Sequence, residues 1–140
     1  MVMKSLEVPA GRLIDSTAKH LKAVPEIKPP EWVLMVKSGS HNERIPTDDD
    51  FWFKRCASIL RTLLTTDRKN LGVRRLQHKY GGRTSHTVAR SHHRKAGGKI
   101  IRVAMQQLEK AGLVKKEKTG RVITNAGKKL LEKSAKAVAA

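Results

Sequence analysis

The sequence predicts a mainly α-helical protein of winged-helix type, a helix-turn-helix followed by a two-stranded β-hairpin, with additional N-terminal helices and a C-terminal helix. Two observations predict this fold class. Apolar residues recur at helical spacing over several segments. Two short alternating runs flank Thr119 and Gly120, between helical segments, which is typical of a hairpin wing. The length of 140 residues suits one modest core, so we expect residues 1–140 to form a single domain.

An N-terminal helical extension is expected at about residues 8–38. Its first helix, within 9–24, carries four apolar residues at helical spacing: Leu13, Ile14, Ala18 and Leu21. Pro30 suits the first turn of a second helix over 30–39, which we expect to end near Gly39.

The next helix is predicted over 51–65, with Asp50 as its N-cap. Its apolar stripe is formed by Phe53, Cys56, Ala57, Leu60, Leu63 and Leu64. Arg55, Ser58 and Thr62 fall opposite this stripe, and Arg61 lies on its flank. A shorter helix within 70–82 turns Leu71 or Val73, Leu76 and Tyr80 inward, and Gly81-Gly82 ends it.

Residues 82–98 show no periodicity, and we expect them to form a long basic loop. The helix predicted over 99–112 has one apolar face, formed by Ile100, Ile101, Ala104, Leu108 and Ala111, and Gly112 ends it. The wing follows over about 113–124, where Gly120 is expected to permit the tight turn. Thr124 or Asn125 caps a last helix over 126–138.

The net charge of +18 indicates a polyanionic partner, with nucleic acid ahead of an anionic membrane surface. Residues 1–50 carry 7 Lys and Arg against 8 Asp and Glu, whereas residues 51–140 carry 23 against 4. Eleven basic residues and no acidic one lie between Asp67 and Glu109. A merely solvated surface mixes both signs, so we expect this excess to gather over one side of the molecule.

Basic residues of the predicted 99–112 helix adjoin those of the loop and the wing. Lys99, Arg102 and Lys110 lie on the polar face of the helix, and charges there often only keep a surface helix in water. Because two more basic elements flank this helix, we prefer the interpretation that it contacts nucleic acid. At the tip of the wing, basic side chains can reach backbone phosphates: Lys115, Lys116, Lys118 and Arg121.

Several motifs, in order along about residues 8–137, resemble the small-subunit ribosomal protein family nineteen-e of archaea and eukaryotes. They are PPEW at 29–32, VK at 36–37, WFKRCAS at 52–58, YGGR at 80–83, IIR at 100–102, QQLEKAGLV at 106–114, GRVIT at 120–124 and a glycine at 127. VPAGRLI at 8–14 and QQLEKAGLV look more archaeal than eukaryotic. The chain departs from the family at Lys54, where an aromatic residue is usual, and after YGGR, where further Gly and Pro are usual.

The resemblance implies a structural constituent of the small ribosomal subunit that binds ribosomal RNA in the head region, beside neighbouring ribosomal proteins, and supports subunit maturation and assembly. It also implies that Arg55, Arg61 and Arg102 matter for that role. The full set of expected RNA contacts is Arg55, Arg61, Arg74, Arg75, Arg83, Arg90, Arg94, Lys95, Lys99, Arg102, Lys115, Lys116, Lys118 and Arg121.

The alternative is a winged-helix regulator of transcription that binds DNA, since the fold alone does not fix the function. An enzyme is not expected, and neither is a cofactor, a metal or a small-molecule substrate. His78, His86, His92 and His93 lack the cysteine partners and spacing of a zinc site, and Cys56 falls in an apolar stripe. No apolar run approaches the length of a membrane span, so we expect a soluble, cytoplasmic, ribosome-associated protein without a membrane partner.

Overall fold

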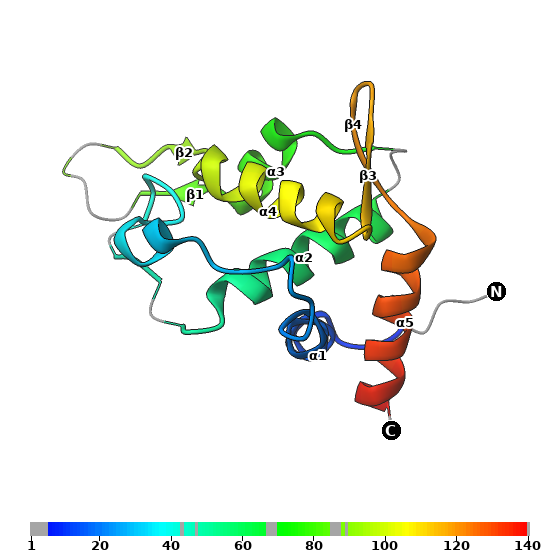
Figure 1. The fold of residues 1–140 in the computed structure, drawn as a ribbon. Coiled ribbons are helices and arrows are strands. Elements are labelled where there is room, and N and C mark those ends of the chain that lie inside the picture. Colours follow the sequence, from blue (N-terminus) through cyan, green and yellow to red (C-terminus); the bar gives the residue numbers. More distant parts are fainter. Residues whose placement is uncertain are drawn as a thin grey trace.

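Helices dominate the described part of the chain, and two small hairpins complete it (Figure 1). The computed structural model describes residues 6–42, 44–46, 48–66, 70–84, 88 and 90–139. Within them lie five α-helices and one short 3₁₀ helix: α1 (Ala10–Leu21), η2 (Glu31–Met35), α2 (Phe51–Thr65), α3 (Val73–Tyr80), α4 (Gly98–Lys110) and α5 (Asn125–Ala139). The strands are β1 (Gly82–Arg83), β2 (His93–Arg94), β3 (Val114–Glu117) and β4 (Gly120–Ile123).

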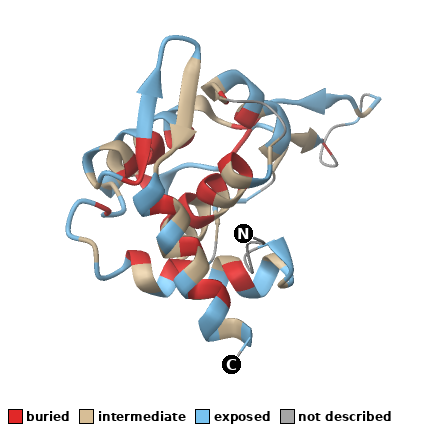
Figure 2. Cartoon of the chain, turned by 90° about the vertical axis from the view of Figure 1, so that its right-hand side faces the viewer, coloured by how far each residue is buried: buried red, intermediate tan, exposed pale blue. Residues whose placement is uncertain are grey.

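The core is built around α2, which the other helices surround. Trp52, Cys56, Ile59 and Leu60 of α2 are at most 1% exposed, and they belong to one cluster with Leu21, Leu76, Ile101, Leu108 and Leu131 from the other α-helices. Figure 2 shows the buried residues concentrated on the inner faces of these helices, while most of β3 is exposed and β4 is intermediate. The predicted apolar faces of α1, α2 and α4 are therefore confirmed. Thr62 differs, because it is buried although the wheel places it opposite the stripe.

The second predicted helix, over 30–39, is wrong, because only the 3₁₀ helix η2 forms there. Val33 N–H donates to the Pro30 carbonyl at 3.1 Å, and Val36 is already extended. Leu34 and Met35 are 73% and 81% exposed, so this segment has no apolar stripe that packs on the core along a longer helix.

Gln107 of α4 holds the segment before η2 against the core. Its side-chain oxygen accepts hydrogen bonds from Trp52 Nε1 at 2.8 Å and from Lys28 N–H at 3.2 Å. Its side-chain nitrogen donates to the Lys28 carbonyl at 2.8 Å. The Gln107 amide thus links α2, α4 and the chain before Pro29. Trp32 also makes an edge-to-face contact with Trp52, with the ring centroids 6.1 Å apart.

Asp50 occupies the N-cap position of α2, but its side chain makes no capping hydrogen bond. Its carboxylate pairs instead with Lys22 Nζ at 2.7 Å. Lys54, where the family usually has an aromatic residue, pairs with Asp48 at 2.5 Å and lies 3.8 Å from Asp15. Asp50 is thus the N-cap residue by position, as predicted, and these ion pairs join the start of α2 to α1 and to Lys22 directly after it.

The stretch over 82–98 is not only a loop, because β1 and β2 pair within it as a short antiparallel hairpin. Gly82 faces Arg94 and Arg83 faces His93. Ala96 N–H then donates to the Gln77 carbonyl at 2.9 Å, and Gly97 N–H to the Ser38 carbonyl at 2.8 Å. Two-residue strands leave no periodic pattern in a sequence, which explains why the prediction missed them. Residues 85–87 and 89 of this stretch lie outside the described residues.

The predicted hairpin over about 113–124 is confirmed as the antiparallel pair β3–β4, which follows α4 directly and which we call the wing. Gly112 ends α4 with φ of 80°, a conformation that favours glycine. Gly120 has another role than the predicted one, since Lys118 and Thr119 form the turn. A Cβ at Gly120 would lie 2.8 Å from the backbone of Leu71, so glycine here permits a close approach.

Leu71 joins the wing through a β-bridge that the sequence did not reveal. Its N–H donates to the Arg121 carbonyl at 3.1 Å, and Arg121 N–H donates to the Leu71 carbonyl at 2.9 Å. Nearby, Asn70 Nδ2 donates to Thr119 Oγ1 at 2.6 Å. The chain entering α3 is thereby fixed to the wing.

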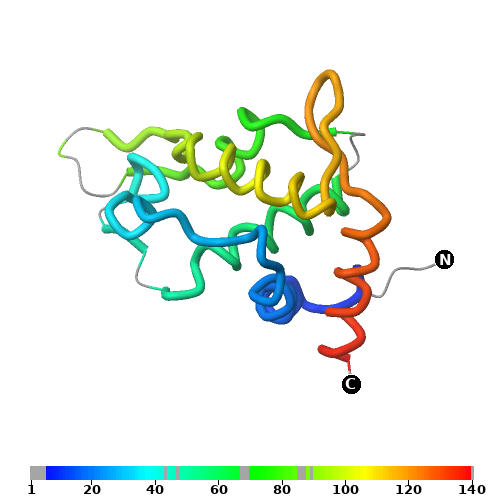
Figure 3. Tube along the Cα trace, viewed as in Figure 1, coloured from blue at the N-terminus to red at the C-terminus, as the bar shows by residue number. Residues whose placement is uncertain are grey.

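The last helix, α5, packs beside α1 (Figure 3). His20 Nδ1 lies 2.9 Å from Ser134 Oγ, and Ser16 Oγ donates to the Ser134 carbonyl at 3.3 Å. Of the two possible caps, Thr124 is the one that acts, because its Oγ1 accepts from Gly127 N–H at 3.3 Å. Among the described residues we find no helix whose length and apolar character would let it cross a membrane.

Candidate nucleic-acid interface

Arg55 is held by aromatic rings where α2 faces α3. Its guanidinium carbon lies 3.9 Å from the centroid of the Tyr80 ring and 5.2 Å from that of Phe51. The Tyr80 hydroxyl is itself fixed, 2.7 Å from Ser58 Oγ. A guanidinium stacked in this way loses little freedom when it binds a ligand, because its plane is already oriented.

Arg61 and Lys79 extend this site along α2. Lys79 Nζ donates a hydrogen bond to Thr62 Oγ1 across the gap between α3 and α2. The Nε of Arg61 is buried and has no hydrogen-bond partner among the described residues. We call Arg55, Arg61 and Lys79 the α2–α3 basic cluster.

The charges of this cluster are not compensated within the described part of the chain, where none of the three forms an ion pair with a carboxylate. Burial lowers the pKa of Arg55, a half-buried residue that nonetheless stays charged. Desolvation of the ammonium lowers the pKa of Lys79, and the neighbouring charges of Arg61 and Arg55 lower it further. The fold therefore holds three positive charges close together, which costs free energy of folding. A bound anion would offset the repulsion between them.

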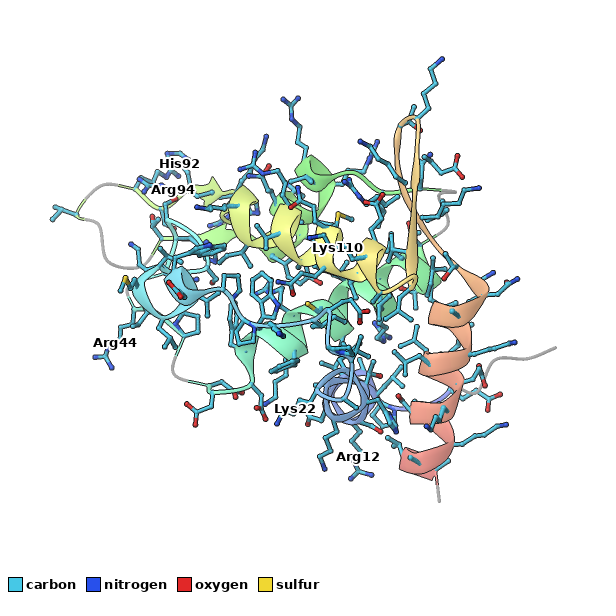
Figure 4. All side chains as sticks on the ribbon, in the orientation of Figure 1. Arg12, Lys22, Arg44, His92, Arg94 and Lys110 are labelled. Carbon is cyan, nitrogen blue, oxygen red and sulfur yellow. The ribbon has the colours of Figure 1, made fainter. Side chains whose placement is uncertain are left out.

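The outer face of α4 presents further cations. Lys99, Arg102 and Lys110 are all exposed, and Figure 4 shows Lys110 near the C-terminal end of the helix. Lys99 Nζ lies 4.8 Å from the centroid of the Trp32 ring, so its position is partly fixed by a cation–π contact. The predicted polar face is thus exposed as expected.

The remaining predicted contacts of α3 and of the 82–98 stretch are exposed as well: Arg74, Arg75, Arg83, Arg90, Arg94 and Lys95. Figure 4 shows Arg94 at the β2 end of the molecule, beside His92. The rings of His78 and His93 contact each other with centroids 4.4 Å apart and planes tilted by 39°, which joins α3 to β2.

The wing divides its basic residues into two groups. Lys115, Lys116 and Lys118 are exposed, and among the described residues only Lys115 has a carboxylate within ion-pair distance, Glu117 at 3.9 Å. The side chain of Arg121 is only 17% exposed, and its Nε lies 3.6 Å from Glu109 Oε2. This partly neutralised position suits a residue that fastens the wing to α4 better than a phosphate contact.

Basic residues are not confined to one side of the molecule. Figure 4 shows Arg12 on α1 and Lys22 directly after it, at the edge of the molecule away from Arg94 and from the wing. Lys22 is paired with Asp50, but Arg12 is exposed and forms no ion pair with a described residue. Lys129, Lys133 and Lys136 are exposed on α5. The expectation that the basic residues gather over one side of the molecule is therefore too simple. The α2–α3 basic cluster differs from the other basic residues because its side chains lie close together and Arg55 is stacked on aromatic rings.

Lys79 and Tyr80 are the site residues that the sequence analysis missed. Lys79 looks like an ordinary lysine near the C-terminal end of a helix, and Tyr80 was assigned to the core. The spacing of Phe51 and Arg55, four residues apart on one helix, was the visible signal that Arg55 could stack on an aromatic ring.

Comparison with known proteins decides the family. A family model described as "Ribosomal protein S19e" matches residues 4–140 of the chain. The chain belongs to the ribosomal protein S19e family. The small ribosomal subunit protein eS19 of Aeropyrum pernix is 45% identical over 139 residues, with 98% of this chain and 90% of that protein covered.

Other S19e relatives come from both archaea and eukaryotes. The small ribosomal subunit protein eS19 of Haloarcula marismortui is 37% identical over 134 residues, covering 92% of this chain and 86% of that protein. The eS19B protein of Schizosaccharomyces pombe is 36% identical over 130 residues, covering 92% and 90%. The resemblance inferred from the motifs is thus confirmed.

As an S19e protein, the chain is a structural protein of the small ribosomal subunit and not an enzyme. Cys56 fits this assignment, because it is fully buried and its burial raises the pKa of the thiol to about 12. A thiol in that state is neither a nucleophile nor a metal ligand. Within the described residues, no three His, Cys, Asp or Glu side chains come together in a way that could hold a metal ion.

Proposed function

We propose that this S19e protein binds ribosomal RNA in the head of the small subunit, contacts neighbouring ribosomal proteins there and supports subunit maturation and assembly. The observation that carries the proposal is the α2–α3 basic cluster, in which Arg55, Arg61 and Lys79 lie close together without a described carboxylate partner. Such a cluster, with one guanidinium already oriented, is suited to a backbone phosphate.

We further propose that residues 1–140 form a single winged-helix domain. Three features support this: the packing of α3 on α4, the hairpin β3–β4 directly after α4, and the β-bridge that adds Leu71 to that hairpin. In this arrangement α4 offers Lys99 and Arg102 while the wing offers Lys115, Lys116 and Lys118.

The expected RNA contacts lie on adjoining elements. Accessible phosphates and 2′-hydroxyls are what structured RNA presents to such a surface, since its major groove is too narrow for side chains to enter. Besides the cluster, the contacts are the exposed cations of α3, of the 82–98 stretch, of α4 and of the wing tip. Arg121 is left out because of its ion pair with Glu109.

Charge reversal on α4 tests the function directly. Arg102 is exposed and supports no described packing or ion pair, so Arg102→Glu is expected to leave the thermal midpoint within about 2 °C of the wild type. In reconstitution, the fraction of protein that co-sediments with small subunits at high salt should fall at least about fivefold, because one contact is lost and a repulsion is introduced.

The control is Arg12→Glu on α1, which makes the same charge change on an exposed residue away from the proposed surface (Figure 4). It should incorporate like the wild type. Normal incorporation of the Arg102→Glu variant would show that α4 is not part of the RNA interface.

Lys79→Gln is expected to separate stability from binding. The pKa of Lys79 is lowered in the fold, so its charged form is disfavoured there and stability rises as the pH climbs from the lowered pKa toward the ordinary one. Removing the charge should therefore leave the thermal midpoint at pH 7 unchanged or higher. Affinity for small-subunit RNA should fall about tenfold, which corresponds to the loss of one charged contact. Thermal melts and filter binding on the same preparation check both parts, and a lower midpoint with unchanged affinity would contradict the assignment.

A further inference from the structure

An apolar groove of about 360 Å³ lies between the segment around η2 and the start of α2. Its lining includes Pro29, Pro30, Val33 and Leu34 from one side and Phe51 and Trp52 from the other. Figure 1 shows η2 and the start of α2 well away from the wing. The volume suits one or two side chains of a bound chain rather than a large cofactor.

The groove is open to solvent on the side of η2. Leu34 lines it and is 73% exposed, and the adjacent Met35 is 81% exposed. Large apolar side chains that a protein leaves uncovered beside a groove are a feature of binding surfaces. The residues that line the groove are also held in place. A hydrogen bond to Gln107 fixes Trp52, and Pro29 and Pro30 restrict the backbone dihedral angles on the other side.

Three carboxylates lie along this groove. Glu31, Asp48 and Asp49 all belong to its lining. Asp48 is paired with Lys54, whereas Glu31 and Asp49 are exposed and form no ion pair with any residue that the structure describes. In a chain with a net charge of +18, this rim is a locally acidic place that attracts cations and repels phosphate.

We propose that the groove docks an extended basic segment of a neighbouring protein, with an apolar side chain of that segment in the groove and its Lys or Arg residues against Glu31 and Asp49. The choice of partner rests on the proposed function, because a neighbouring protein that also binds ribosomal RNA carries basic segments. Charge complementarity then favours such a segment over a second copy of this chain, which would bring another +18.

The test uses fluorescence anisotropy with the full chain and a labelled nonapeptide, Arg-Lys-Pro-Leu-Lys-Pro-Leu-Arg-Lys. We expect saturable binding to the wild type. Two matched peptides define the chemistry: one with both Leu replaced by Ser, and one with every Lys and Arg replaced by Glu. Both are expected to bind at least about fivefold more weakly.

Protein variants locate the binding. The double variant Glu31→Gln with Asp49→Asn should weaken peptide binding about 3- to 10-fold, and Leu34→Ser about 10-fold. The matched control, Glu7→Gln with Glu117→Gln, removes two exposed carboxylates elsewhere and should bind like the wild type. The affinity of the groove variants for small-subunit RNA should be unchanged. Failure of the docking proposal can therefore be distinguished from failure of the proposed RNA binding.

Three outcomes would overturn the proposal. The first is an absence of saturable binding to the wild type, and the second is equal binding by the groove variants and the control. The third is sedimentation of the free protein as a dimer that Leu34→Ser abolishes, which would make a second copy of the chain the occupant.

Discussion

Replacing Arg55 and Arg61 together by glutamine is expected to weaken binding to small-subunit RNA about 100-fold. Each guanidinium can make charged hydrogen bonds to phosphate worth roughly 1.5 kcal/mol, and the loss of two such contacts gives about 3 kcal/mol. Arg55 should dominate, because its stacking on Tyr80 and Phe51 orients it before RNA arrives. Filter binding or anisotropy at one fixed salt concentration measures the change.

The control for this prediction is Arg12→Gln with Lys19→Gln on α1, which removes the same net charge from exposed positions. If affinity followed net charge alone, both double variants would lose it equally. We expect the α1 variant to lose less than about threefold, because neither residue is among the proposed contacts and Figure 4 shows Arg12 at the edge of the molecule away from Arg94 and from the wing. Equal losses would contradict a localised site.

Trp52→Ala is expected to have the largest effect on stability. The side chain is 1% exposed in the centre of the core, and its removal should cost about 3–5 kcal/mol, a large share of the roughly 5–15 kcal/mol that stabilises a domain. The thermal midpoint should fall by about 15 °C. Calorimetry or circular dichroism measures it, and a fall below about 3 °C would show that this ring does not hold the core together.

Trp52→Phe separates the ring from its polar group. The aromatic contact with Trp32 remains, but the hydrogen bond from Nε1 to Gln107 is lost. Because Gln107 still accepts from Lys28 N–H, the expected cost is only about 1–2 kcal/mol. At a temperature where all these variants are folded, neither change should alter RNA affinity, since Trp52 reaches no proposed contact.

Periodicity predicted those parts of the fold that bury one long face. The helices α1, α2, α4 and α5 each repeat apolar residues on a core-facing side, and the wing is preceded by Gly112, whose φ of 80° ends α4. The predicted helix over 30–39 failed for the matching reason, because Leu34 and Met35 have no core to face. The β-bridge at Leu71 and the strands β1 and β2 are only one or two residues long. Segments this short show no apolar periodicity, so the sequence did not predict them.

The candidate site was predictable by residue type but not by geometry. The basic excess and the family resemblance singled out Arg55, Arg61 and Arg102. The stacking of Arg55 on Tyr80 depends on how α2 and α3 pack, and no local pattern records that packing. The ion pair between Arg121 and Glu109 likewise depends on how the wing packs on α4, so the sequence did not reveal that this predicted contact has a carboxylate beside it.

The dependence of RNA binding on salt tests the account most directly. For the wild type, a plot of log affinity against log salt should fall with a slope of about −0.7 to −0.9 for each phosphate contacted, and several contacts make it steep. The variant lacking Arg55 and Arg61 should lose about two such increments, while the variant lacking Arg12 and Lys19 keeps the wild-type slope. A flat wild-type plot, or the same slope in both variants, would contradict recognition of phosphates by the α2–α3 basic cluster.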